Sequence, residues 1–315
     1  MKLLKPNFWS KGKFNLYALA LLPLSFFLQL IIFVKKKIVK PIKFNIKIIC
    51  VGNIYIGGTG KTPLCIKINE ILTKKNKETA IIKKFYKNHY DEIDLLKKNV
   101  KNLFVNSSRK EAINVAIKNK CDVAILDDGL QDYSISKDLK IVCFTSKQWF
   151  GNRHTIPSGP LREPLKSIEK FNIVMVNIND EKHIQKINMD INKIKDKIKI
   201  YHFKYELKPE IIDKFKNKKL FAFAGIGNPN NFFDLLDSSG LNLEKKLSFP
   251  DHYNYSENEI KKLLKEANNN NLELITTEKD YLRLKEFNLK KINFMPIDLK
   301  IFEEDKFIKE IKKYI

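Results

Sequence analysis

The sequence is poor in residues that define several classes of protein. Glycine and proline occur only 11 times each among 315 residues, which excludes a collagen-like or low-complexity chain. The cysteines, Cys50, Cys65, Cys121 and Cys143, form no CxxC pair, so we expect free, buried thiols in a reducing compartment rather than a disulfide framework or a zinc site. A disordered chain is excluded as well, because hydrophobic residues make up 43% of the sequence.

Acidic residues are also in short supply. Asp and Glu number 36 against 59 Lys and Arg, which gives a formal net charge of +23. Such an excess favours a phosphate-rich partner, which would be a nucleotide, a nucleic acid or the anionic surface of a membrane. Because Lys dominates the excess and Ile and Asn are abundant too, base composition is an alternative source for part of it.

Only one long run lacks charged residues. Residues 14–34 are 21 uncharged residues, and a helix of that length spans about 31 Å, close to the roughly 30 Å hydrocarbon core of a bilayer. Pro23 and Gln29 interrupt the run, which keeps open a helix lying in the membrane interface, and a buried core helix is a third alternative. Lysines follow between positions 35 and 43, so we expect the rest of the chain on the cytoplasmic side.

The strongest motif is IICVGNIYIGGTGKTP, residues 48–63. A buried strand leading through a glycine-rich turn into a helix that begins with Lys and Thr is the context of a phosphate-binding loop (P-loop). Its backbone N–H groups can surround phosphate oxygens, Lys61 would neutralise the β- and γ-phosphates, and Thr62 would hold Mg²⁺. A glycine-rich turn with an incidental lysine is the alternative. The predicted nucleotide-binding residues are Ile56, Gly57, Gly58, Thr59, Gly60, Lys61 and Thr62.

Two further motifs point to the same nucleotide. The strand of CDVAILDDGLQD ends in Asp127 and Asp128, where an NTPase places a carboxylate on the metal side of the nucleotide. The loop IPSGPLREP presents Arg162, which has the geometry to clamp a phosphate or to pair with Glu163 at the surface. We predict Thr62 with both aspartates as the metal site.

The alternation of strands and helices after residue 44 predicts an α/β fold with a mostly parallel sheet, like that of P-loop NTPases. We expect a membrane helix and basic spacer at 1–44, a P-loop kinase domain at 45–205, and a second, smaller α/β domain at 206–315. In that second domain, FPDHYN places His252 at a strand end, and TTEKD resembles a helix start with Thr277 and Asp280 as a capping pair.

Together these motifs resemble one family, tetraacyldisaccharide 4′-kinase, which is the lipid A 4′-kinase of the inner membrane of Gram-negative bacteria. The resemblance covers nearly the whole chain and rests on VGNIYIGGTGKTP, LDDGLQD, GPLREP, AGIGNP, the DH of FPDHY, and TEKD, in the family's order. It implies transfer of the γ-phosphate of ATP, with Mg²⁺, to the 4′-hydroxyl of a tetraacyldisaccharide 1-phosphate to give lipid IVA. It further implies two α/β domains joined by a β-ribbon, on the cytoplasmic face of the inner membrane.

The resemblance also implies roles for particular residues. The family's catalytic base is an Asp supported by the His of the DH pair, and these correspond to Asp91 in HYDEIDLL and to His252. Lys61 belongs to the catalytic set, and Arg109 and Arg162 are expected to bind substrate. The family's SRGY appears as Lys83, Lys84, Phe85 and Tyr86, and Asp132 stands where a His usually follows DDGLQ.

The implied partners are the lipid A precursor and the inner-membrane surface, with a monomer expected and no nucleic acid. Two other functions remain open on the sequence. One is a membrane-tethered P-loop ATPase, including a nucleic-acid motor that would use the basic surface. The other is a nucleotide-binding membrane adaptor that has lost catalysis, which the changed SRGY motif keeps open.

Overall fold

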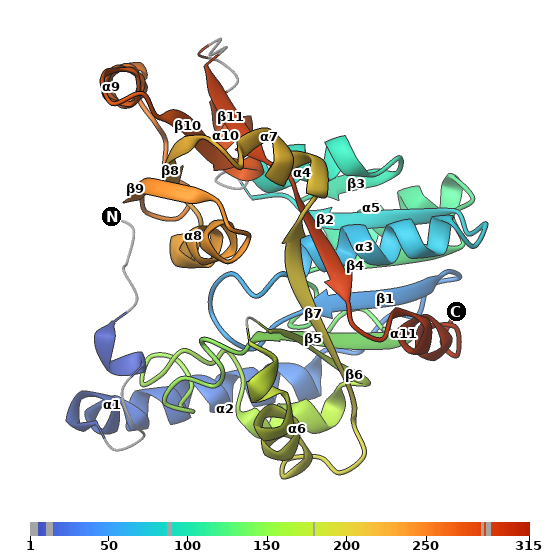
Figure 1. Cartoon of the computed structure of the whole chain (residues 1–315). Helices are drawn as coiled ribbons and strands as arrows, with labels where there is room; N and C mark the ends of the chain where they lie inside the picture. The colour runs from blue at the N-terminus through green and yellow to red at the C-terminus, as the bar shows by residue number, and fades with distance from the viewer. Residues whose placement is uncertain (1–5, 11–14, 87–89, 179, 285–286, 288–290) are drawn as a thin grey trace. The chain divides into compact units, whose positions relative to one another are not determined.

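The computed structural model describes residues 6–10, 15–86, 90–178, 180–284, 287 and 291–315 (Figure 1). The chain forms two compact units: the first contains Met1–Phe85, Val100–Lys204 and Ile301–Ile315, and the second contains Tyr86–Asn99 and Tyr205–Lys300. The division after Lys204 lies next to the boundary predicted at 205/206. Two segments depart from the predicted division: Tyr86–Asn99 belongs to the second unit, and Ile301–Ile315 belongs to the first.

Packing explains why each of these two segments belongs to a different unit from the one predicted. Helix α4 (Tyr90–Asn99) packs on helix α10 (Glu278–Arg283) and so belongs to the second unit. Helix α11 (Glu304–Ile311) returns to the first unit, where the ring of its buried Phe307 lies edge-on to Tyr201, with centroids 5.2 Å apart. Neither contact leaves a local signal in the sequence, because each joins segments far apart in the chain.

The first sheet is mostly parallel, as predicted. The described residues form an eight-stranded sheet whose order is β12 (Ile297–Ile301), β7 (Lys199–Leu207), β6 (Ile173–Asn177), β5 (Leu139–Thr145), β1 (Lys47–Gly52), β4 (Val123–Asp127), β2 (Thr79–Lys84) and β3 (Leu103–Asn106). Strands β7 to β3 in this order pair in parallel. Strand β4 is buried along its whole length and β1 along all but its first residue, as expected for apolar strands covered on both faces.

Helices α3 (Lys61–Thr73) and α5 (Arg109–Lys118) cover this sheet. Helix α3 packs on β1, β2 and β4, and α5 packs on β2 and β3. All four cysteines are buried and free, as predicted, and burial raises the pKa of the Cys50 thiol to about 12. The central strands therefore form a rigid base whose carboxyl ends carry the candidate site.

The second unit is built on a smaller parallel sheet. Its strands, among the described residues, have the order β11 (Ile292–Met295), β10 (Glu273–Thr277), β8 (Lys219–Ala224) and β9 (Asn242–Ser248). Helix α8 (Pro229–Ser238) packs on β8 and β9, whereas α9 (Glu257–Asn269) packs on β10. The strand predicted at 293–297 is divided at Pro296, which separates β11 from β12, since proline cannot donate a ladder hydrogen bond. The remaining elements are η1 (Asn7–Trp9), η2 (Leu165–Lys170), η3 (Glu181–His183), α6 (Ile184–Asn192) and α7 (Pro209–Phe215).

The uncharged N-terminal run is not one continuous helix. It forms α1 (Leu16–Ala20) and α2 (Leu22–Ile38), separated at Leu21, while Phe14 lies outside the described residues. Pro23 explains the break, because proline is accommodated only in the first turn of a helix. Among the helices that the structure describes, none combines the length and the apolar character needed to cross a bilayer.

Helix α2 turns Ser25 and Gln29 toward the protein and most of its apolar side chains outward. Ser25 Oγ donates to Thr155 O at 2.9 Å, and Gln29 Nε2 donates to Arg162 O at 3.3 Å. The outward side chains include Phe26, which is 73% exposed. The other exposed apolar side chains of α2 are Leu24, Phe27, Leu30, Ile31, Phe33, Val34 and Ile38. This polarity is the reverse of that of a helix packed on a protein core.

Gly159 lies in the loop beside α2, where the chain is closely packed. A Cβ at Gly159 would lie 2.2 Å from Asn152 Oδ1 and 2.3 Å from the backbone oxygen of His154. We therefore expect Gly159→Ala to lower the free energy of unfolding by about 1–3 kcal/mol, the usual cost of overpacking. Thermal or urea unfolding measures this loss. Gly58→Ala is the control, because no atom lies within 4 Å of that Cβ; equal stability of the two variants would contradict the packing.

Candidate active site

The loop between β1 and α3 has the form expected of a phosphate-binding loop. Gly60 caps α3 in the left-handed conformation, with φ of 85°, and Lys61 is the first helical residue. Gly57 also has a positive φ, 122°, and its carbonyl oxygen accepts from Asn53 Nδ2 at 3.0 Å. Backbone N–H groups at the start of α3 are thus available to an anion, whereas the N–H of Ile56 donates to Pro160 O at 2.9 Å. The nucleotide-binding role of residues 56–62 stays a prediction.

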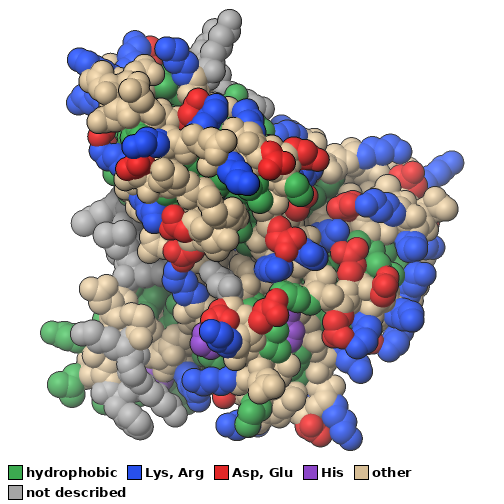
Figure 2. Space-filling model, in the orientation of Figure 1, with side chains coloured by type: hydrophobic (Ala, Val, Ile, Leu, Met, Phe, Trp, Pro, Cys, Tyr) green, Lys and Arg blue, Asp and Glu red, His purple; other side chains and the backbone are tan. Residues whose placement is uncertain are grey.

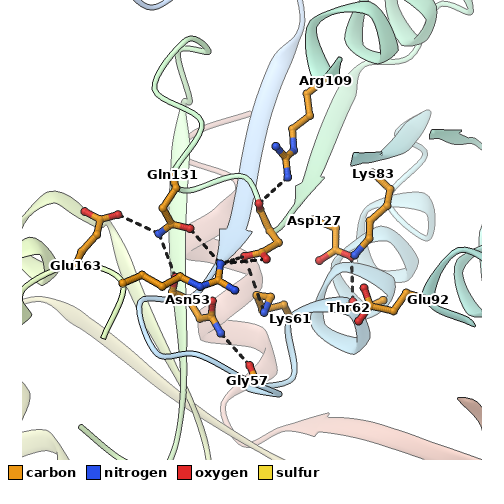
Figure 3. Close-up of polar contacts among 12 residues, drawn as sticks. Asn53, Gly57, Lys61, Thr62, Lys83, Glu92, Arg109, Asp127, Gln131 and Glu163 are labelled. Carbon is orange, nitrogen blue, oxygen red and sulfur yellow. Dashed lines mark hydrogen bonds and ion pairs between the residues drawn. The ribbon is translucent and has the colours of Figure 1, made fainter. Parts of the chain in front are cut away.

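The hydroxyl of Thr62 meets the carboxylate of Asp127 at the end of β4. Thr62 Oγ1 donates to Asp127 Oδ2 at 2.9 Å, and Lys83 Nζ donates to the same oxygen at 2.6 Å (Figure 3). Asp127 is fully buried and Lys83 is only 4% exposed. A buried carboxylate requires a partner of opposite charge, and the ammonium group of Lys83 provides it.

Sequence reasoning missed the role of Lys83. The sequence showed Lys83 only as a departure from SRGY, yet the register of the parallel strands places it directly opposite Asp127. The available signal was Lys83 directly after the apolar residues 80–82 of β2, because a charge that continues a buried strand needs a partner.

The oxygen atoms around Thr62 fit a magnesium ion. Asp127 Oδ1 and Thr59 Oγ1 are buried and have no hydrogen-bond partner among the described residues. The Thr62 hydroxyl donates its proton to Asp127 and so keeps oxygen lone pairs for a cation. In the described part of the chain no group of three or more His, Cys, Asp or Glu side chains could hold a metal. Mg²⁺ is usually held by one or two carboxylates plus phosphates and water, so Asp127 Oδ1 and the Thr62 hydroxyl are the oxygens that could hold it.

Asp128 has different partners from Asp127. Arg162 Nη1 donates to both of its carboxylate oxygens at 3.2 Å, and Lys61 Nζ lies 3.9 Å from Oδ1. Burial acts to raise the pKa of the Asp128 carboxyl, but Lys61 and Arg162 outweigh it and hold the pKa below its ordinary value. Arg162 thus pairs with Asp128 and not with Glu163. Its predicted contact with a phosphate stays a prediction.

Glu163 joins the site to α2. Its carboxylate accepts from Lys36 Nζ at 2.7 Å and from Gln131 Nε2 at 2.9 Å. Gln131 Nε2 also donates to the backbone oxygen of Asn53 at 3.2 Å, and Asn53 in turn holds Gly57 (Figure 3). A continuous path of hydrogen bonds therefore leads from the N-terminal helix to the phosphate-binding loop.

Arg109 lies at the first turn of α5 and is buried. Its Nη2 donates to the backbone oxygen of Asp128 at 2.7 Å, and its Nη1 lies 3.4 Å from Asp132 Oδ2. Asp132, which the sequence showed only as a change from a usual His, is thus the anionic partner of this arginine. The predicted role of Arg109 in binding substrate stays a prediction.

Asp91 and His252 are brought together in the second unit, although 161 positions separate them. His252 Nδ1 lies 3.0 Å from Asp91 Oδ1. Burial acts to raise the pKa of the Asp91 carboxyl, but the hydrogen bond from His252 and the charges of Lys279 and Arg283 outweigh it and hold the pKa well below its usual range. Asp91 is therefore ionised at neutral pH and able to accept a proton.

The TEKD segment forms the predicted cap. Thr277 Oγ1 accepts from Asp280 N at 3.1 Å at the start of α10 and donates to Asp280 Oδ2 at 2.6 Å. Asp280 is fully buried. The motif is thus a helix start whose carboxylate serves a larger network.

The buried pair of Lys83 and Asp127 generates a stability prediction. Lys83→Met would leave the carboxylate of Asp127 buried without a counter-charge, so we expect a loss of about 3–5 kcal/mol in the free energy of unfolding. Chemical unfolding followed by circular dichroism measures it. Lys74→Met is the control, because Lys74 pairs with Glu70 at the solvent-exposed surface, where an ion pair adds little to stability. Equal effects of both changes would show that the buried pair has no special weight.

Comparison with known proteins confirms the resemblance. The profile of the family described as tetraacyldisaccharide-1-P 4′-kinase matches residues 17–315. A protein named tetraacyldisaccharide 4′-kinase from Pelagibacter ubique (strain HTCC1062) is 45% identical over 314 residues, which cover 99% of this chain and 98% of that protein. Another of the same name, from Rickettsia canadensis (strain McKiel), is 35% identical over 307 residues, covering 91% and 90%. The crystal structure described as an "apo" form of LpxK from Aquifex aeolicus in complex with ATP has a TM-score of 0.71 at 24% identity, covering 94% of this chain and 99% of that one, and shows the same fold. The chain belongs to the tetraacyldisaccharide-1-phosphate 4′-kinase family.

Proposed function

We propose that this protein transfers the γ-phosphate of ATP to the 4′-hydroxyl of a tetraacyldisaccharide 1-phosphate, giving lipid IVA in lipid A biosynthesis. Membership of the kinase family supports the reaction. The observation that carries it is the phosphate-binding loop, in which the first turn of α3 brings Thr62 to the carboxylate of Asp127.

ATP binds with its phosphates at the N-terminus of α3. The backbone N–H groups of residues 57–61 surround the phosphate oxygens, and the Lys61 ammonium neutralises the β- and γ-phosphates. Arg162 and Lys61 both contact the carboxylate of Asp128, so the two cations lie close together. The planar guanidinium of Arg162 can bind a phosphate with two hydrogen bonds. Arg109 and Arg162 are the proposed contacts to the phosphates of ATP and lipid.

Thr62 and Asp127 would hold the Mg²⁺ ion, with Asp128 on the same side of the site. The ion supplies charge neutralisation of the triphosphate as negative charge builds up on the leaving group. The residues of the chain contribute orientation, because Lys83 and Thr62 fix one carboxylate oxygen of Asp127 and leave the other without a partner among the described residues.

Asp91 and His252 handle the proton of the acceptor. The sugar oxygen forms a bond to the γ-phosphorus, the bond from this phosphorus to the bridging oxygen of ADP breaks, and the hydroxyl proton passes to Asp91. His252 orients the carboxylate through its Nδ1. The left-handed backbone of His252, with φ of 53°, is unusual for a residue with a side chain and is typical of functional positions.

We further propose that α1 and α2 attach the protein to the cytoplasmic face of the inner membrane. The outward apolar side chains of α2 are followed by Lys35, Lys36, Lys37, Lys40 and Lys43, and basic residues beside an apolar helix favour an anionic bilayer. Figure 2 shows the Lys and Arg side chains of the visible surface interspersed with acidic ones, so general surface charge does not carry this argument. A monomer suffices for the proposed chemistry.

The kinase assignment is tested with [γ-³²P]ATP and tetraacyldisaccharide 1-phosphate, followed by thin-layer chromatography. The wild-type protein should give a labelled lipid, and Lys61→Ala should lower turnover at least about 100-fold, because an electrostatic contact to the transferred phosphate is lost. Lys74→Ala removes an exposed charge from the other end of the same helix and should keep turnover within about twofold. Near-normal turnover of Lys61→Ala would contradict the phosphate-binding loop.

Membrane attachment is tested by sedimentation with vesicles that contain phosphatidylglycerol. Phe26→Glu should lower the bound fraction at least about tenfold, because burial of a Phe side chain contributes about 1.5–3 kcal/mol. Val115→Glu is the matched control, since Val115 is an exposed apolar residue of α5. Equal binding of both variants, or no binding of the wild type, would contradict the proposal.

A further inference from the structure

Arg283, the last residue of α10, is held in place by three acceptors. Its Nη2 donates to Asp91 Oδ2 at 2.6 Å, and its Nη1 donates to Asp280 Oδ1 at 2.7 Å and to the backbone oxygen of Gly225 at 2.8 Å. Its side chain is only 11% exposed. A guanidinium group suits this arrangement because its N–H groups form a rigid planar fork.

We propose that Arg283 is a positioning residue of the phosphoryl-transfer reaction, which fixes the carboxylate of Asp91 for the acceptor hydroxyl. The proposal rests on the proposed function, in which Asp91 takes the proton of that hydroxyl. Arg283 itself touches neither substrate nor phosphate in this scheme and acts through Asp91.

The two oxygens of Asp91 have separate partners. Oδ1 lies against His252 Nδ1, and Oδ2 accepts from Arg283 Nη2, so rotation of the carboxylate about its Cβ–Cγ bond would break both contacts. A carboxylate has about four lone-pair sites, and each oxygen therefore keeps one for an incoming hydroxyl. The two partners fix the direction of the base without exhausting its capacity to accept a proton.

One backbone carbonyl, that of Gly225, supports both partners of Asp91. The carbonyl oxygen of Gly225 accepts from Arg283 Nη1 and also from the backbone N–H of His252 at 3.0 Å. The N–H of Gly225 donates to Asp280 Oδ2 at 3.0 Å. A Cβ at Gly225 would lie 2.8 Å from Tyr255 Oη, which explains why glycine stands here.

Asp280 completes the support. Its carboxylate accepts from Arg283, from Tyr255 Oη at 2.9 Å and from Thr277 Oγ1 at 2.6 Å. A fully buried carboxylate with this many partners cannot reorient without a large cost. The TEKD motif thus anchors the arginine that reaches the catalytic carboxylate.

The same contacts set the charge state of Asp91. The charged and titratable groups that face it are His252, Lys279 and Arg283; Asp280 lies on the far side of Arg283, and Asp251 Oδ1 lies 3.8 Å from His252 Nε2. Because Arg283 helps to lower the pKa of Asp91, its removal raises that pKa. More Asp91 is then protonated at a given acidic pH, so the acidic limb of the kcat profile moves to higher pH.

The experiment uses the full chain with ATP and tetraacyldisaccharide 1-phosphate and compares Arg283→Met, Arg283→Lys and Asp91→Asn. We expect Arg283→Met to lower kcat about 10- to 100-fold, with the KM for ATP within about twofold and the acidic limb moved to higher pH. Arg283→Lys keeps the charge, so the limb should stay near that of the wild type. Its kcat should still fall at least about fivefold, because one ammonium group lacks the fork geometry. This variant keeps the test informative if Arg283→Met fails to fold, which thermal unfolding would reveal.

Lys98→Met is the matched control. Lys98 lies on α4 and pairs with Glu278 at the start of α10, so its removal deletes a charge between the same two helices without touching Asp91. Its kcat and pH profile should match the wild type. If Lys98→Met lowered kcat as much as Arg283→Met, the effect of Arg283 would be explained by the packing of the two helices, and the proposal would be wrong.

The two levels of the proposal fail differently. One outcome is that Asp91→Asn lowers kcat at least about 100-fold while both Arg283 variants have the kcat and the acidic limb of the pH profile of the wild type. The role proposed for Arg283 is then wrong, and the proposed function stands. If Asp91→Asn loses less than about tenfold, Asp91 is not the base, and the positioning role falls with it.

Discussion

The buried carboxylate of Asp127 is the point on which the first unit depends. It ends β4, accepts from Lys83 of β2 and from Thr62 of α3, and so ties two strands and a helix at one oxygen atom. A carboxylate is costly to bury at this depth, and the ammonium of Lys83 and the hydroxyl of Thr62 compensate that cost. The start of α3, and with it the phosphate-binding loop, is therefore fixed by the same contacts that stabilise the charge. In the proposed function, stability and nucleotide binding therefore depend on the same small group of atoms.

The second unit uses a carboxylate in a similar way. Asp280 follows β10, and its carboxylate accepts hydrogen bonds from several groups. The donors include the N–H of Gly225, directly after β8, the hydroxyl of Tyr255 and the guanidinium of Arg283. In both units the functional groups lie at the carboxyl ends of parallel strands, where loops from neighbouring strands converge. Each unit thus presents charged side chains from a rigid base, which include Lys61 and Arg162 in the first unit and Asp91 in the second.

The sequence predicted those features that depend on local patterns. The apolar strand, glycine-rich turn and helix around Lys61 are contiguous, and so is the cap formed by Thr277 and Asp280. The capping box of Ser256 and Glu259 at α9 was equally readable but was missed. The edge strand β9 was also missed, because its residues are nowhere fully buried and its hydrophobic alternation is weak. Contacts over long separations, such as Lys83 with Asp127, depend on strand register that no local pattern encodes. The uncharged N-terminal run was visible, but its division into α1 and α2, with polar side chains turned inward, required the structure.

The position of the new phosphate tests the central claim most directly. Two-dimensional ¹H–³¹P correlation spectroscopy of the lipid formed by the purified protein from ATP and tetraacyldisaccharide 1-phosphate identifies the carbon that carries it. A kinase with this site gives one new phosphate on C4′ and one ADP for each lipid phosphorylated. Formation of ADP and inorganic phosphate without a phosphorylated lipid, under conditions in which the lipid is dispersed and Mg²⁺ is present, would contradict the account.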